Sequence, residues 1–264
     1  TAALLLIATP LVILFSMAHI GSKCQTAPLN MQQCTLFRVL WVHTSLDMFK
    51  QRLMPGWIIL MGALTAIGPL SIDMYLPGFP AIGKEFDAGS RVELSLASFF
   101  IGLAIGQLFY GPISDRYGRK PPLYFGLSLF LLASVGAATS QSIEALIGWR
   151  FIQGLGGCAG MVIARAVVRD RCDAQEAARA FSLLILVMGI APILAPLLGG
   201  IIVTESGWRS IFIVLAIFAF GCLIAIRYML KESHSVSGSH PLILRKVLRD
   251  YLQILTNREF MRYT

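Results

Sequence analysis

Long apolar runs separated by short charged segments constrain this chain more than any other feature of its sequence. The clearest case is residues 92–113 and 121–139, which flank a charged segment at residues 111–120. A helix needs about 20 residues to cross a bilayer, and each run is about that long. The charged segment holds three cations and one anion, so we expect it to lie at a membrane surface, because charge buried in hydrocarbon is costly.

The composition of the whole chain also indicates a protein with several membrane spans. Of its 264 residues, 56% are hydrophobic and 14% are charged, whereas soluble proteins have about 25% charged residues. The net charge of +8 comes from bases gathered in loops, which favours membrane orientation over nucleic-acid binding. The five cysteines show no disulfide or metal spacing, and no catalytic constellation is visible, so we expect neither a metal site nor an enzyme.

The apolar pattern predicts an all-α membrane protein in which residues 48–231 form six spans. Residues 1–47 have three interpretations: an extra span, an uncleaved signal-like segment, or a leader that is not native, which the methionine at position 48 favours. Residues 232–264 are expected to be a linker with a basic amphipathic helix. The predicted spans are residues 54–77, 92–113, 121–139, 143–162, 180–203 and 210–230.

Loop charge predicts the orientation of these spans. The loops after the second, fourth and sixth spans are rich in arginine and lysine, whereas acids offset the few bases of the opposite loops. The positive-inside rule then places residue 54 and residues 231–264 in the cytoplasm.

Four motifs resemble the major facilitator superfamily. The charged segment has the form Gly-x-x-x-Asp-Arg-x-Gly-Arg-Lys, which resembles the loop between the second and third helices of that superfamily. Residues 146–156 are similar to its fourth-helix motif, and residues 189–200 to the fifth-helix signature of its antiporter branch, with Ala195 replacing a glycine. Residues 69–80 resemble the first-helix end of the bicyclomycin/chloramphenicol-resistance type of drug:proton antiporter.

The resemblance covers about residues 54–231 and implies the six-transmembrane-helix N-terminal half of a major facilitator superfamily transporter. Such transporters have two six-helix halves with the substrate site between them. The resemblance therefore implies a missing C-terminal six-helix half as a partner.

Two ionisable residues, Asp73 and Arg150, fall inside predicted spans. A charge in a span indicates a functional site, and both residues are expected in the outer half of the membrane. An ion pair between them is expected if the first and fourth spans are neighbours. The resemblance associates Arg150 with proton coupling, and Gln153 lies one turn further along. We hypothesise that these three residues couple proton and substrate movement; the alternatives are a helix-end role for Asp73 and a structural, snorkelling Arg150.

The charged segment is expected to act as a cytoplasmic gate. Charge-assisted hydrogen bonds there would latch the two halves, Asp115 would face a helix N-terminus, and two glycines would supply tight backbone geometry. Asp170, in the next cytoplasmic loop, is expected to pair with Arg116 or Arg119. The gate residues are Gly111, Asp115, Arg116, Gly118, Arg119, Lys120 and Asp170.

Two further groups complete the candidate site. The resemblance links the fifth-span motif to export, and its prolines are expected to break and bend that helix. Flexible and aromatic side chains near the first and second spans are candidates for lining a drug cavity. The two groups are Gly189, Pro192, Pro196, Gly199 and Gly200 for the antiporter motif, and Met74, Tyr75 and Phe99 for the cavity.

These features together predict proton-coupled export of small amphipathic drugs across the bacterial inner membrane by alternating access. The proton gradient would drive the exchange, with no cofactor. One alternative is a proton-coupled uptake symporter for a small metabolite, which is expected to lack the proline-glycine signature of the fifth span. The other is a non-transporting membrane scaffold, which would have no need for buried Asp73 and Arg150.

Overall fold

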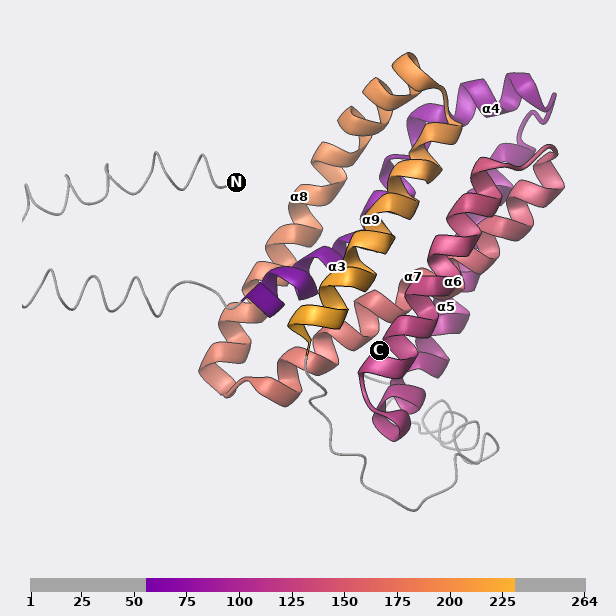
Figure 1. The fold of residues 1–264 in the computed structure, drawn as a ribbon. Helices are drawn as coiled ribbons and strands as arrows, with labels where there is room; N and C mark the ends of the chain where they lie inside the picture. The colour runs from indigo at the N-terminus through magenta and orange to yellow at the C-terminus, as the bar shows by residue number, and fades with distance from the viewer. Residues whose placement is uncertain (1–55, 231–264) are drawn as a thin grey trace, which may run out of the picture. The chain divides into compact units, whose positions relative to one another are not determined.

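The computed structural model describes residues 56–230, and these residues form helices joined by short connections (Figure 1). Six stretches are long and apolar enough to cross a membrane, the first being α3, η1 and α4 taken together. The predicted all-α architecture with six spans is therefore confirmed. The interpretations of residues 1–47 and of the linker at 232–264 lie outside the described residues. The elements are α3 (Gly56–Asp73), η1 (Leu76–Gly78), α4 (Phe79–Glu85), α5 (Arg91–Tyr117), α6 (Lys120–Ala138), α7 (Ile143–Arg171), α8 (Ala174–Ser206) and α9 (Arg209–Met229).

Several helices extend beyond the apolar runs that predicted them. Helix α5 continues to Tyr117 and α7 to Arg171, so most of the two charged segments that we expected to be loops are helical. Hydropathy falls where a helix leaves the membrane, but the backbone hydrogen bonds continue. The prolines of α8 do not break it, because α8 is one helix through both of them.

The connection between α5 and α6 consists of Gly118 and Arg119 alone. Gly118 has φ +87°, a conformation that a residue with a Cβ atom adopts only with strain. The glycine therefore allows the chain to reverse within two residues. At the next connection, the side chain of Asp173 accepts a hydrogen bond from the Glu176 backbone N–H and caps the start of α8.

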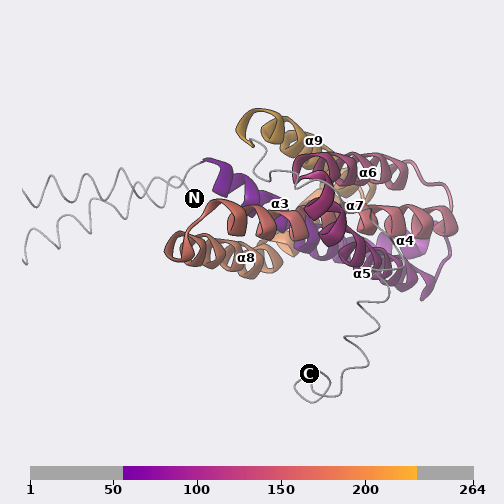
Figure 2. The same cartoon turned by 90° about the horizontal axis from the view of Figure 1, so that it is seen from below.

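Helix α7 lies among the other helices. Figure 2 shows α7 between α5 and α6, with α3 alongside, and α7 contacts all three. Its most apolar window is 67% buried, whereas that of α8 is 17% buried. Helix α7 is therefore the core of the described residues, and α8 turns most of its apolar surface outward.

Glycines bring the backbones of α5 and α7 into direct contact. A Cβ atom added to Gly102 on α5 would overlap the Phe151 carbonyl oxygen, and one added to Gly154 on α7 would overlap the Phe99 carbonyl oxygen. Small residues at such crossings permit close van der Waals packing between membrane helices. The reciprocal contact fixes α5 against α7 over one helical turn.

We expect Gly154→Ala to lower the free energy of unfolding by about 1–3 kcal/mol, because the added methyl group forces two backbones apart. The measurement is unfolding of the detergent-solubilised full-length protein. Gly148→Ala is the matched control on the same helix, because a Cβ atom there meets nothing within 4 Å. Equal stability of the two variants would contradict the proposed contact.

Candidate functional site

Arg150 is the largest fully buried side chain of the described residues. Its Nη1 donates a hydrogen bond to Gln153 Oε1 at 2.6 Å, and its Nη2 donates to the Ser71 carbonyl oxygen at 3.1 Å. Its Nε is buried and has no hydrogen-bond partner among the described residues. The arginine of α7 is therefore tied to α3 and retains one unused donor.

Aromatic rings surround the guanidinium of Arg150. Its Cζ lies 4.5 Å from the ring centroid of Tyr75, 4.3 Å from that of Phe99 and 5.8 Å from that of Phe212. A cation over an aromatic face is attracted by the ring quadrupole, most strongly where water is excluded. Because the rings come from the end of the first span, from α5 and from α9, three elements stabilise one charge on α7.

Asp73 does not pair with Arg150. Among residues 56–230 the ion pairs involve other residues, although α3 and α7 are in contact as the hypothesis required. The acceptors of Arg150 are Ser71 and Gln153 instead. Asp73 follows Ser71 by two residues, which on a helix turns it about 200° away. The expected ion pair is therefore wrong for this structure, while a role of Asp73 in coupling stays a prediction.

Gln153 extends the polar contacts of Arg150 to a third helix. Its Nε2 donates to Ser134 Oγ on α6 at 2.8 Å, and that hydroxyl donates to the Phe130 carbonyl oxygen at 2.7 Å. The structure thus brings Arg150 and Gln153 together, as their spacing indicated. It also adds Ser71 and Ser134, which the sequence analysis missed because a serine in an apolar span has no distinctive signal.

The candidates for cavity lining are buried in the described residues. Tyr75 and Phe99 contact Arg150, and the Tyr75 hydroxyl lies 2.7 Å from Ser95 Oγ. The backbone of Met74 lies against Gly199. Direct contact of these side chains with a drug stays a prediction, and in this structure two of them support the arginine.

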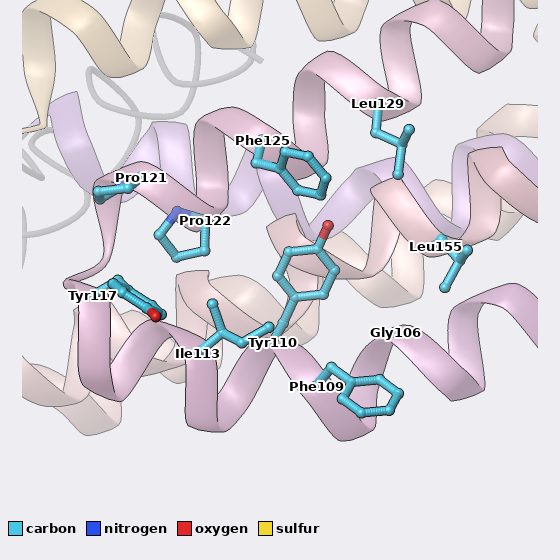
Figure 3. Close-up of a pocket in the computed structure, with 10 residues that line it drawn as sticks. All are labelled: Gly106, Phe109, Tyr110, Ile113, Tyr117, Pro121, Pro122, Phe125, Leu129 and Leu155. Atoms are coloured by element: carbon cyan, nitrogen blue, oxygen red, sulfur yellow. The ribbon is translucent and has the colours of Figure 1, made fainter. Parts of the chain in front are cut away.

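An apolar cleft lies away from Arg150, between α5 and α6. Figure 3 shows Tyr110 and Phe125 lying between these two helices, with Leu155 of α7 nearby. The volume of the cleft is about 500 Å³. None of the predicted site residues lines it.

Arg119 organises the charged segment. Its side chain is nearly inaccessible, and its Nε donates to Asp170 Oδ2 at 2.7 Å. Its Nη1 donates to Asp115 Oδ1 at 2.6 Å and to Ser114 Oγ at 2.8 Å. Burial acts to lower the pKa of Arg119, but the hydrogen bonds from Asp170 and Asp115 outweigh it and raise the pKa. The charged guanidinium therefore links the end of α5 to the end of α7.

These contacts decide between the pairings that the sequence left open. Asp170 pairs with Arg119, and Asp115 faces the residue at the N-cap of α6. Gly118 makes the tight turn, but Gly111 is helical and has open space around it, so its expected backbone role is wrong here. Of the other gate residues, Arg116 lies over the Tyr117 ring and Lys120 begins α6.

The antiporter motif has one close contact in the described residues. A Cβ atom on Gly199 would overlap the Met74 carbonyl oxygen, so this glycine lets α8 touch the end of the first span. Gly189 and Gly200 have open space, and Pro192 and Pro196 lie within α8. The motif thus joins α8 to the backbone next to Tyr75.

Comparison with known proteins places residues 58–263 in a match to the family model described as Major Facilitator Superfamily. The chain is 41% identical over 217 residues to the uncharacterized MFS-type transporter YdgK of Bacillus subtilis, covering 81% of this chain and 54% of that protein. It is 32% identical over 208 residues to a bicyclomycin resistance protein homolog of Haemophilus influenzae, covering 78% and 52%. It is 35% identical over 185 residues to the multidrug resistance protein MdtL of Escherichia coli, covering 70% and 47%. The chain thus spans about half the length of the curated relatives that it matches.

Solved structures show the same fold at lower identity. The chain superposes on a crystal structure of the peptide transporter POT with a TM-score of 0.60 and 18% identity, covering 78% of this chain and 47% of that one. It superposes on the proton:xylose symporter XylE with a TM-score of 0.59 and 20% identity, covering 67% and 46%.

We expect Asp170→Asn to destabilise the protein more than Asp115→Asn. The Asp170 side chain is 18% exposed and that of Asp115 is 60% exposed, so only the first substitution leaves a largely buried cation short of its partner. The expected losses are about 2–4 kcal/mol for Asp170→Asn and under about 1 kcal/mol for Asp115→Asn. Thermal unfolding of the solubilised full-length variants measures the difference, and similar losses would contradict the central position of the Asp170 contact.

Proposed function

Because the chain belongs to the Major Facilitator Superfamily, we propose that it is the N-terminal half of a transporter that exports drugs in exchange for protons. The chain is a multi-pass membrane protein with six candidate spans, and its relatives include the bicyclomycin resistance homolog and MdtL. The names of those two proteins support drugs as the substrate class. The proposed location is the bacterial inner membrane, with the Arg119 end of the helices in the cytoplasm, as loop charge predicts.

The buried Arg150 is the observation that carries the proposal. A permanent charge inside a membrane span is costly and marks a substrate or ion pathway. A purely structural residue at this position would be less costly if apolar. Here the charge is kept in place by Ser71, Gln153 and three rings, and its Nε remains available. A guanidinium held in this way responds to any change of charge near it.

The proposed coupling places the proton on Asp73. This carboxyl group ends α3 two residues after Ser71, whose carbonyl oxygen accepts from Arg150. Loss or gain of a proton at Asp73 changes the charge at the end of the helix that anchors the arginine. The field at Arg150 changes with it, and this change is the proposed link between proton binding and movement of the half that contains α3 and α7.

In the proposed transport cycle, two halves rock about a site between them. The Arg119 contacts join α5 and α7 at one end, and the Arg150 contacts join α3, α6 and α7 within the spans. This half would therefore move as one body. Gly199 extends the body to α8, because it packs on the backbone of the first span.

We expect Asp73→Asn to abolish drug-driven proton movement in the full-length transporter while membrane insertion remains normal, because asparagine cannot exchange the proton. A pH-sensitive dye in everted membrane vesicles measures the proton flux when drug is added. Glu144→Gln is the control, because Glu144 is an exposed acid paired with Arg91. Proton flux unchanged in Asp73→Asn would remove the coupling role from this residue.

We expect Arg150→Lys to lower the rate of drug exchange at least about tenfold. An ammonium has no planar fork with which to reach Ser71 and Gln153 together while lying against the rings. Arg165→Lys is the control, because Arg165 is exposed on the same helix. Radiolabelled drug uptake into everted vesicles gives the rate and the KM. Activity equal to that of the control would show that the cage needs only a positive charge.

A further inference from the structure

A second cleft lies between α6 and α9, away from every residue discussed so far. These helices pack side by side (Figure 2). The cleft has a volume of about 490 Å³ and is lined by Tyr124 of α6 and by Leu223, Ile224, Arg227 and Tyr228 of α9. Tyr124 lies one turn after the start of α6, and Arg227 lies in the last turn of α9. The cleft is therefore at the same end of the helices as Arg119.

The polar groups of this cleft are hydrogen-bond donors that lack partners. Arg227 is exposed and forms no ion pair with another residue of the described range 56–230. The Tyr124 hydroxyl is buried, with no hydrogen-bond partner in the same range. An unsatisfied buried hydroxyl is unfavourable, so a ligand with acceptor oxygens would stabilise the cleft. The lining includes no carboxylate, and its charge complements an anion.

The apolar lining lies deeper in the membrane than the arginine. Leu223 and Ile224 precede Arg227 by one turn, which is about 5–6 Å along the helix axis. Tyr228 is 82% exposed, as is common for tyrosines at the level of lipid headgroups. A ligand that fits this arrangement has an anionic oxygen-bearing head at the end of the spans and an apolar chain that runs inward.

We propose that the cleft between α6 and α9 binds the phosphate of an anionic phospholipid in the cytoplasmic leaflet. Arg227 would hold the phosphate, Leu223 and Ile224 would contact an acyl chain, and a phosphate oxygen would accept from Tyr124 after a small side-chain rotation. Basic pockets between membrane helices on the cytoplasmic side favour such headgroups. A zwitterionic lipid is less suitable, because its ammonium would find no acid in the lining. The proposal requires the orientation predicted from loop charge and is independent of drug export.

The experiment uses the purified full-length transporter and counts bound lipids by native mass spectrometry. Phosphatidylglycerol and phosphatidylcholine with the same acyl chains are added in equal amounts. We expect phosphatidylglycerol to be retained preferentially, Arg227→Gln to weaken its binding about five- to tenfold, and Tyr124→Phe to weaken it about fivefold. Arg227→Lys keeps the charge and should retain most of the preference. The matched control is Arg169→Gln, which removes an exposed arginine from α7 at the same end.

Specific outcomes would overturn the proposal. If Arg227→Gln binds phosphatidylglycerol as the wild type does, Arg227 has another partner, such as an acid of the downstream chain. If Arg169→Gln causes the same loss as Arg227→Gln, the lipid responds to surface charge in general. If the wild type retains both lipids equally, the cleft does not select for an anion. Because Tyr124→Phe removes one hydroxyl and no charge, it tests the site even if a charge variant fails to fold.

Discussion

The burial of Arg150 is the constraint on which the rest of the described structure depends. A guanidinium removed from water is stable only if its donors and its charge are satisfied locally. Ser71 and Gln153 accept two of its hydrogen bonds, and the rings of Tyr75, Phe99 and Phe212 surround its cation. Because these groups come from different elements, a shift of any one of them exposes or strands the charge. The positions of α3, α5, α7 and α9 are thus coupled through one side chain.

The glycines place the groups that satisfy the arginine. Gly154 of α7 lies on the backbone of Phe99, and Gly199 of α8 lies on the backbone of Met74, next to Tyr75. In each case the absence of a side chain lets a helix approach the backbone at or beside a caging aromatic residue. Close packing and charge burial are therefore linked: a larger residue at Gly154 would push the helix that bears Phe99 away from the helix that bears Arg150.

The number of spans could be predicted from the sequence because bilayer-length apolar runs have few other interpretations. Helix ends could not, since α5 continues to Tyr117 where hydropathy falls but hydrogen bonding does not. Arg150 and Gln153 stood out because polar residues are rare in spans. The partners of Arg150 did not, because a backbone carbonyl at Ser71 has no sequence signature. The ion pair with Asp73 was wrong because spacing gives depth in the membrane, whereas pairing depends on which side of the helix a residue occupies.

Two arginines, Arg119 and Arg150, divide the work of holding this half together. Arg119 joins the ends of α5 and α7 through carboxylates, where water and a high dielectric moderate the charge. Arg150 is held by a carbonyl, an amide and rings, where a permanent carboxylate partner would neutralise it. A neutralised pair would be insensitive to a proton nearby, whereas an uncompensated cation is sensitive to one. The absence of a carboxylate at Arg150 among residues 56–230 is therefore consistent with a sensor of charge, and the two carboxylates at Arg119 with a fixed joint.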